Sequence, residues 1–177
     1  MVCLVRAWIL LSTLLVAGGW VLSALHQLNT AGYLTLFALA LLAIGWQWRP
    51  VVTATREIYH REWPKIWRRR RRPLPFWFFA LAVMSLASGL LYVPTNADSN
   101  GYRIPRVLHW LAAGQWHWIH TLDSRMNVAN CGYEWLMAPL LLFTHTDRLL
   151  FLVNWVSYLL LPGLIFSVFG RFIGQKE

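Results

Sequence analysis

The run AWILLSTLLVAGGWVLSALHQLNTAGYLTLFALALLAIGWQW, residues 7–48, decides the fold class, because its 42 residues include no Asp, Glu, Lys or Arg. One membrane crossing needs only about 20 apolar residues, so the run is too long for a single helix. A polar cluster from His26 to Gly32 divides it, and the Asn and Gly in that cluster suit a turn. The run therefore predicts a helical hairpin, with helices over residues 7–25 and 31–48.

Two further uncharged segments, residues 74–93 and 149–169, each have the length of a membrane span. The chain is 58% hydrophobic and 13% charged, whereas soluble domains carry about a quarter of charged residues. Composition and pattern together predict an all-α polytopic membrane protein. It has four transmembrane helices and an outer loop that carries two juxtamembrane amphipathic helices.

Positive charge is concentrated in residues 49–73, which hold nine basic and two acidic residues and end in the five arginines Arg68–Arg72. Basic loops are retained in the cytoplasm, so this segment predicts a cytoplasmic loop with a short interfacial helix. Both termini, including the tail 171–177, are then cytoplasmic. The loop 94–148 lies on the outer, periplasmic or extracellular, face of the inner membrane. The net charge of +9 is interpreted as attraction to anionic membrane lipids, and nucleic acid is excluded as a partner.

The loop 94–148 carries four arginines and four acids in an otherwise apolar chain, which makes it the first candidate for chemistry. We expect one helix from Asp98 to about Ala113, stopped by Gly114, and a second over residues 133–144 on the outer surface. On the first helix, Asp98, Tyr102, Arg106 and His109 would share a face toward a groove. His117, His120 and Asp123 could hold a metal ion, but ordinary interfacial histidines are the favoured interpretation.

The stretch DSNGYRIPRVLHW, residues 98–110, resembles a motif of bacterial GT-C membrane glycosyltransferases. The branch related to aminoarabinose and protein O-mannosyl transferases often begins D-x-x-x-Y-H-x-P-R-x-x-x-W, and Arg103 stands where histidine is more usual. The residues that match this pattern are Asp98, Tyr102, Pro105, Arg106 and Trp110. Beyond the motif, the resemblance includes Arg125, Asn130, Glu134 and the stretch TDRLLFLVNW. The resemblance covers about residues 74–170, and it implies the amino-terminal portion of such an enzyme.

The resemblance implies transfer of a sugar from a polyprenyl-phosphate donor to an acceptor at the outer membrane face. Asp98 would be the catalytic base, or the ligand of a divalent metal ion. The residues implied to bind substrate are Tyr102, Arg103, Arg106, Arg125 and Glu134, with Trp110 beside them. Simpler roles stay open for these side chains. Asp98 could cap its helix, Arg106 could pair with Asp98 or bind lipid head groups, and Glu134 could pair with Arg125. Packing at the membrane interface is the favoured role of Tyr102 and Trp110.

Members of the family usually carry many more membrane spans than the four predicted for this chain. Two hypotheses account for this difference. The first is an amino-terminal catalytic portion with a hairpin at 1–48, a loop at 49–73 and a core at 74–170. It would be inactive alone and completed by a second membrane chain. The second is a non-enzymatic membrane protein, either a truncated remnant or an accessory subunit of a glycosyltransferase. The sequence leaves open whether the chain is an enzyme.

Overall fold

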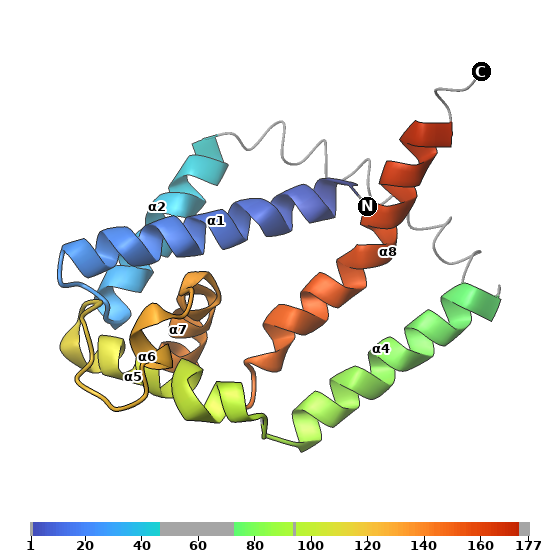
Figure 1. Ribbon diagram of the computed structural model, residues 1–177. Coiled ribbons are helices and arrows are strands. Elements are labelled where there is room, and N and C mark those ends of the chain that lie inside the picture. Colours follow the sequence, from blue (N-terminus) through green and yellow to red (C-terminus); the bar gives the residue numbers. More distant parts are fainter. Residues whose placement is uncertain (1, 47–72, 94, 174–177) are drawn as a thin grey trace.

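The protein, seen in a computed structural model, is described over residues 2–46, 73–93 and 95–173 (Figure 1). All regular secondary structure in these ranges is helical, and no strand occurs in them. The α-helices are α1 (Val2–Ala24), α2 (Thr30–Trp46), α4 (Pro73–Leu91), α5 (Ile104–Ala113), α6 (Arg125–Val128), α7 (Gly132–Thr144) and α8 (Phe151–Ile173); η1 (Ser99–Arg103) is a π-helix. The predicted all-α class is confirmed.

Two helices are long and apolar enough to cross a membrane, Leu4–Ala24 within α1 and the whole of α4. Helix α2 and the portion Phe151–Ile165 of α8 are apolar but shorter. Four transmembrane helices therefore stay a prediction. The predicted cytoplasmic loop 49–73, with its interfacial helix and arginine run, lies outside the described residues except for its last residue, Pro73.

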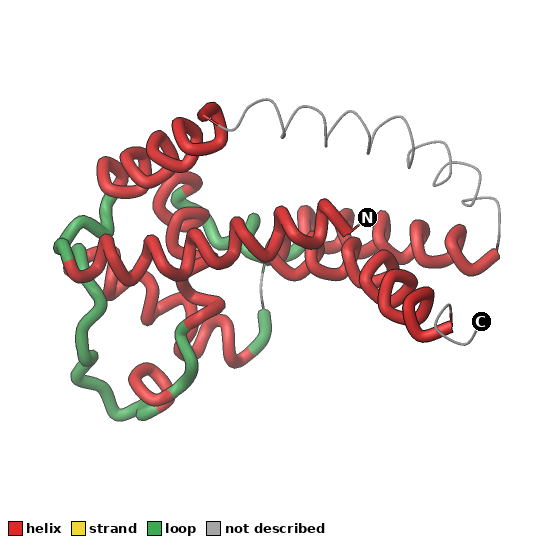
Figure 2. The backbone as a smooth tube through the Cα atoms, turned by 90° about the horizontal axis from the view of Figure 1, so that it is seen from above, coloured by secondary structure: helices red, strands yellow, loops and turns green. Residues whose placement is uncertain are grey.

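The four long helices carry the shorter elements at one end, away from the start of α1 and the end of α8 (Figure 1). Most loops of the described residues lie toward the same end (Figure 2). Helix α8 packs against α4, where the Trp155 indole N–H donates to the Ala82 carbonyl at 2.9 Å. Phe78 stacks on Tyr158 with ring centroids 4.8 Å apart. A Cβ on Gly89 would lie 2.4 Å from the Phe151 ring, so the two helices meet closely there.

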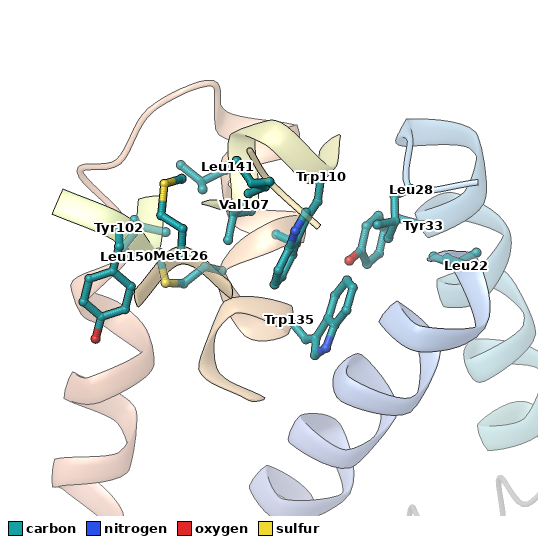
Figure 3. Packing of buried hydrophobic residues seen from close by; sticks show 13 residues of the cluster. Leu22, Leu28, Tyr33, Tyr102, Val107, Trp110, Met126, Trp135, Leu141 and Leu150 are labelled. Carbon is teal, nitrogen blue, oxygen red and sulfur yellow. The ribbon is translucent and has the colours of Figure 1, made fainter. Parts of the chain in front are cut away.

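The core lies where α5 and α7 meet the α1–α2 hairpin (Figure 3). Trp110 of α5 stacks on Trp135 of α7 with centroids 5.0 Å apart, and Trp20 of α1 lies 5.1 Å from Trp135. Small residues of α1 allow close packing at two positions. A Cβ on Gly18 would lie 2.4 Å from Leu36, and one on Gly19 would lie 2.5 Å from Trp135.

The turn between α1 and α2 is bound to the chain that follows α5. The Leu28 N–H donates to the Gly114 carbonyl at 2.9 Å, and the Trp116 N–H donates to the Ser23 hydroxyl at 2.7 Å. Gly114 ends α5 as predicted, with φ at +68°, a left-handed conformation that glycine adopts without strain. The hairpin and the segment around α5 and α7 therefore share one core.

Residues 133–144 form a helix within one residue of its predicted bounds, and its place at the outer membrane surface stays a prediction. Helix α7 is surrounded by neighbours and packs against α1, α2 and α5. Its buried residues are Glu134, Trp135, Met137, Ala138, Pro139 and Leu141. These buried positions point to more than one side of the helix, whereas an amphipathic helix buries a single face.

Candidate functional site

A cavity of about 660 Å³ lies at the start of the loop segment, where η1 approaches α7 and α8. This volume falls within the range of roughly 300–1,000 Å³ found for small-molecule sites. Its lining residues are Asn96, Ala97, Asp98, Ser99, Arg103, Tyr133 and Asn154. Two of the predicted site residues, Asp98 and Arg103, therefore share one cavity.

The π-helical turn explains why these two residues share the cavity. The Ile104 N–H donates to the Ser99 carbonyl, five residues earlier, whereas an α-helix bonds residues four apart. One turn therefore holds an additional residue, and side chains five apart come to the same side. The predicted face assumed a regular α-helix and grouped Asp98 with Tyr102. In the structure Arg103 lines the cavity with Asp98, and Tyr102 is buried in the core.

Asp98 has a mostly exposed carboxylate, 62% accessible, with Arg125 as its ion-pair partner at 4.0 Å. The simpler role of helix cap is wrong, because Asp98 makes no capping hydrogen bond through its side chain. Asn96 does this instead, with its side-chain oxygen accepting from the Ser99 N–H at 2.6 Å. The Asp98 carboxylate is thus not engaged by the helix terminus, and Asp98 lines the cavity.

Arg103 is about one-third exposed and is held by neighbours on three sides. One guanidinium nitrogen lies 3.7 Å from the Glu134 carboxylate. Its guanidinium carbon lies 5.5 Å from the Tyr102 ring centroid and 5.6 Å from that of Tyr133. The single Glu134 carboxylate contacts two arginines, so it does not neutralise both guanidinium groups. The positive charge of Arg103 can therefore also bind an anionic ligand.

Arg106 and Glu134 form a buried ion pair, with their side chains 1% and 0% exposed. The Arg106 guanidinium also donates to the carbonyls of Ala129, at 2.7 Å, and Asn130, at 3.1 Å. The simpler pairings expected from the sequence, Arg106 with Asp98 and Glu134 with Arg125, are both wrong. Neither Arg106 nor Glu134 lines the cavity, so their predicted contact with substrate stays a prediction.

Arg125 pairs closely with Asp123, two residues before it. Its Nε lies 3.0 Å from one carboxylate oxygen of Asp123, and its Nη2 lies 2.8 Å from the other. The hydrogen bond from Arg125 holds the pKa of Asp123 below its usual value, and the same bond raises the pKa of Arg125. Arg125 also lies 5.3 Å from the Tyr102 ring centroid.

Tyr102 and Trp110, for which the resemblance implied a place beside the substrate, belong to the core, with 6% and 1% exposure. The Tyr102 ring is a contact surface for arginines, since the guanidinium of Arg106 also lies 5.8 Å from its centroid. Trp110 has the Arg106 guanidinium 5.3 Å from its ring. Both side chains therefore position arginines, and neither lines the cavity.

A second cavity of about 330 Å³ adjoins the first, because Asn96, Ser99, Tyr133 and Asn154 line both. Arg148 and Tyr92 line only the second one. Burial raises the pKa of Tyr133, so this hydroxyl stays protonated, and it donates to the Leu150 carbonyl at 3.5 Å. We call the two adjoining cavities together the groove.

Sequence reasoning missed Asn96, Tyr133 and Asn154 as groove residues, and it quoted Arg148 only as part of a motif. One signal was available for Asn154, which is a polar amide in the otherwise apolar run LLFLVNWV. Polar side chains within an apolar helix are often functional. No comparable signal marks Asn96 or Tyr133, because polar residues at a membrane edge are common.

The histidines expected as a weak metal site do not form one in the described part of the chain. Within residues 2–46, 73–93 and 95–173, no three His, Cys, Asp or Glu side chains gather in an arrangement that could hold a metal ion. Asp98 is the one carboxylate that lines the larger cavity. The divalent ion implied for Asp98 stays a prediction, and no step below depends on it.

Comparison of the chain with protein-family models, curated proteins and solved structures finds no match.

Proposed function

We propose that this chain carries the donor site of a membrane glycosyltransferase that uses a polyprenyl-phosphate sugar. The observation that supports this most directly is the larger cavity, because Asp98 and Arg103 both line it. A carboxylate can accept a proton from an acceptor hydroxyl, and an arginine can stabilise charge on phosphate.

We propose further that the chain spans the inner membrane four times, through α1, α2, α4 and α8. Support comes from the apolar character of all four helices and from the gathering of η1, α5, α6 and α7 at one end of them (Figure 1). The groove would then open at the outer membrane face, with residues 49–73 in the cytoplasm.

The reaction needs one proton transfer and one exchange of bonds at the anomeric carbon. An acceptor hydroxyl attacks this carbon while its proton passes to the Asp98 carboxylate. The bond between the anomeric carbon and the phosphate oxygen breaks, and the electron pair leaves with the polyprenyl phosphate. Arg103 stabilises the negative charge that develops on that phosphate. The leaving group needs no added proton, because a phosphate is already a good leaving group.

The buried residues have positioning roles in this proposal. Glu134 holds Arg106 and contacts Arg103 at 3.7 Å, so it sets the place of the cavity arginine. Arg125 lies 4.0 Å from Asp98 and contributes positive charge beside the base, while Asp123 balances part of that charge.

Transfer of label from a polyprenyl-phosphate sugar to membrane acceptors tests the proposal. The assay compares native membranes with and without the chain, so that any partner chain is present. Asp98→Asn should lower transfer roughly 100-fold or more, because the acceptor loses its base. Asp123→Asn is the matched control, since this carboxylate lies outside the cavity, and it should leave most transfer intact.

Two results would overturn the proposal in different ways. Full transfer by Asp98→Asn would remove Asp98 from the chemistry. Transfer no higher than in membranes without the chain would favour the second hypothesis, a non-enzymatic subunit of a glycosyltransferase.

A further inference from the structure

The groove changes character along its length. The larger cavity is lined mainly by polar and charged side chains, including Asp98 and Arg103. The smaller cavity adds an apolar part and a second arginine. Its apolar lining residues are Gly89, Val93, Met137, Leu150 and Phe151. A ligand that fills the whole groove therefore meets Asp98 and Arg103 in the larger cavity, and meets Arg148 and this apolar part in the smaller one.

The apolar part lies at the ends of two helices that are candidates to contact lipid. Ser88, Gly89 and Tyr92 come from the end of α4 and the residue after it, and Phe151 begins α8. Helix α4 is long and apolar enough to cross a membrane and is exposed along most of its length. A hydrocarbon chain that leaves the smaller cavity can thus continue along α4 and α8.

Arg148 supplies positive charge at this part of the groove. Its side chain is exposed and makes no ion pair with the residues that the structure describes. Arg106 and Arg125 differ, because Glu134 and Asp123 already occupy their guanidinium groups. An arginine without a carboxylate partner, next to an apolar wall, suits an anionic lipid head group, and its planar guanidinium matches phosphate oxygens.

We propose that Arg148 binds the phosphate of a lipid-borne phosphate ester in the smaller cavity. The lipid chain leaves along the exposed side of α4. The group attached to the phosphate enters the larger cavity beside Asp98, and the phosphate lies between Arg148 and Arg103. This assignment rests on the proposed function and replaces Arg106 and Arg125 as phosphate ligands.

Binding of a lipid phosphate without a sugar tests this assignment separately from transfer. The full chain is placed in phosphatidylcholine nanodiscs that contain increasing amounts of undecaprenyl phosphate, and the bound lipid is counted by native mass spectrometry. Arg148→Gln should weaken binding roughly 10- to 100-fold, the effect of losing charge-assisted hydrogen bonds. Arg148→Lys should retain part of the affinity. Arg6→Gln, which removes an arginine of α1 that lines neither cavity, should bind like the wild type.

Two competitors identify the source of the phosphate. Phosphatidic acid in the nanodisc should compete with undecaprenyl phosphate, and its competition should be lost in Arg148→Gln. Inorganic phosphate in the buffer should compete far more weakly, because it cannot use the apolar wall. Equal competition by inorganic phosphate would overturn the lipid part of the assignment.

The remaining outcomes separate this inference from the proposed function. Wild-type binding that is unchanged in Arg148→Gln would overturn the role of Arg148 and leave the role of Asp98 in transfer standing. No binding of undecaprenyl phosphate by the wild type would overturn both proposals. A thermal unfolding curve of Arg148→Gln that matches the wild type establishes that any loss of binding is local.

Discussion

Arg106 and Glu134 form the most buried charged contact in the described part of the chain, and this makes them sensitive to single substitutions. The Arg106 guanidinium has three acceptors, namely Glu134 and the carbonyls of Ala129 and Asn130. Removing one charge of a buried pair leaves the other without compensation and typically costs 3–5 kcal/mol. The pair also joins α5 to α7, 28 positions apart in sequence.

Glu134→Gln should therefore lower the free energy of unfolding by roughly 3–5 kcal/mol, because Arg106 stays charged and buried. Equilibrium unfolding in mixed detergent micelles, followed by tryptophan fluorescence, measures this. The double substitution Arg106→Met with Glu134→Leu should recover part of the loss, since it removes both charges together. A Glu134→Gln protein as stable as the wild type would mean that water reaches the pair.

Residues of the groove were predictable only where their chemistry is distinctive. Asp98 and Arg103 stand out as charges at a membrane edge, and they do share a cavity. The pairing of Arg106 with Glu134 was out of reach, because it depends on how α5 packs on α7. Several acids and arginines in the loop 94–148 could have formed pairs, and no spacing rule selects among partners in different elements.

At the scale of elements, the chain's uncharged runs and its glycines predicted the helices well. The third predicted span, 74–93, corresponds to α4 at Pro73–Leu91, and Gly114 ends α5 as expected. Such limits follow from local chemistry, namely apolar length and backbone freedom at glycine. The π-turn of η1 was not predicted, since an i to i+5 bond is stabilised by surroundings such as the burial of Tyr102.

Helix α1 offers a direct test of how its small residues position α7. A Cβ on Gly19 would lie 2.5 Å from the Trp135 ring, and that ring is fixed between Trp110 and Trp20. Gly19→Ala should destabilise the fold by about 1–3 kcal/mol through overpacking. The same unfolding measurement in micelles applies.

The matched control is Gly45→Ala in α2, where an added Cβ meets no atom within 4 Å. This change should leave stability unchanged or raise it by up to about 1 kcal/mol, because alanine favours helix over glycine. Equal effects of the two substitutions would show that helix propensity, and not contact with Trp135, explains the result at Gly19.

At the scale of the whole molecule, the four long helices form a support that keeps the groove at one end. The turn between α1 and α2 is bound to Gly114 and Trp116, and the ends of α4 and α8 line the smaller cavity. The groove itself is lined by residues between Ser88 and Asn154. The proposed use of a lipid-borne donor further requires that this end of the molecule lies at the outer face of the membrane.

Cysteine accessibility tests this orientation. Leu122 lies in the loop after α5 and is fully exposed, so a cysteine there should react with a membrane-impermeant maleimide in intact cells. The starting protein has Cys3 and Cys131 replaced by serine, so that only the new thiol reacts. A cysteine at Lys65, within the basic segment predicted to be cytoplasmic, should react only after the cells are permeabilised. The opposite pattern would place the groove in the cytoplasm, where the donor and acceptor proposed for the outer face could not meet at Asp98.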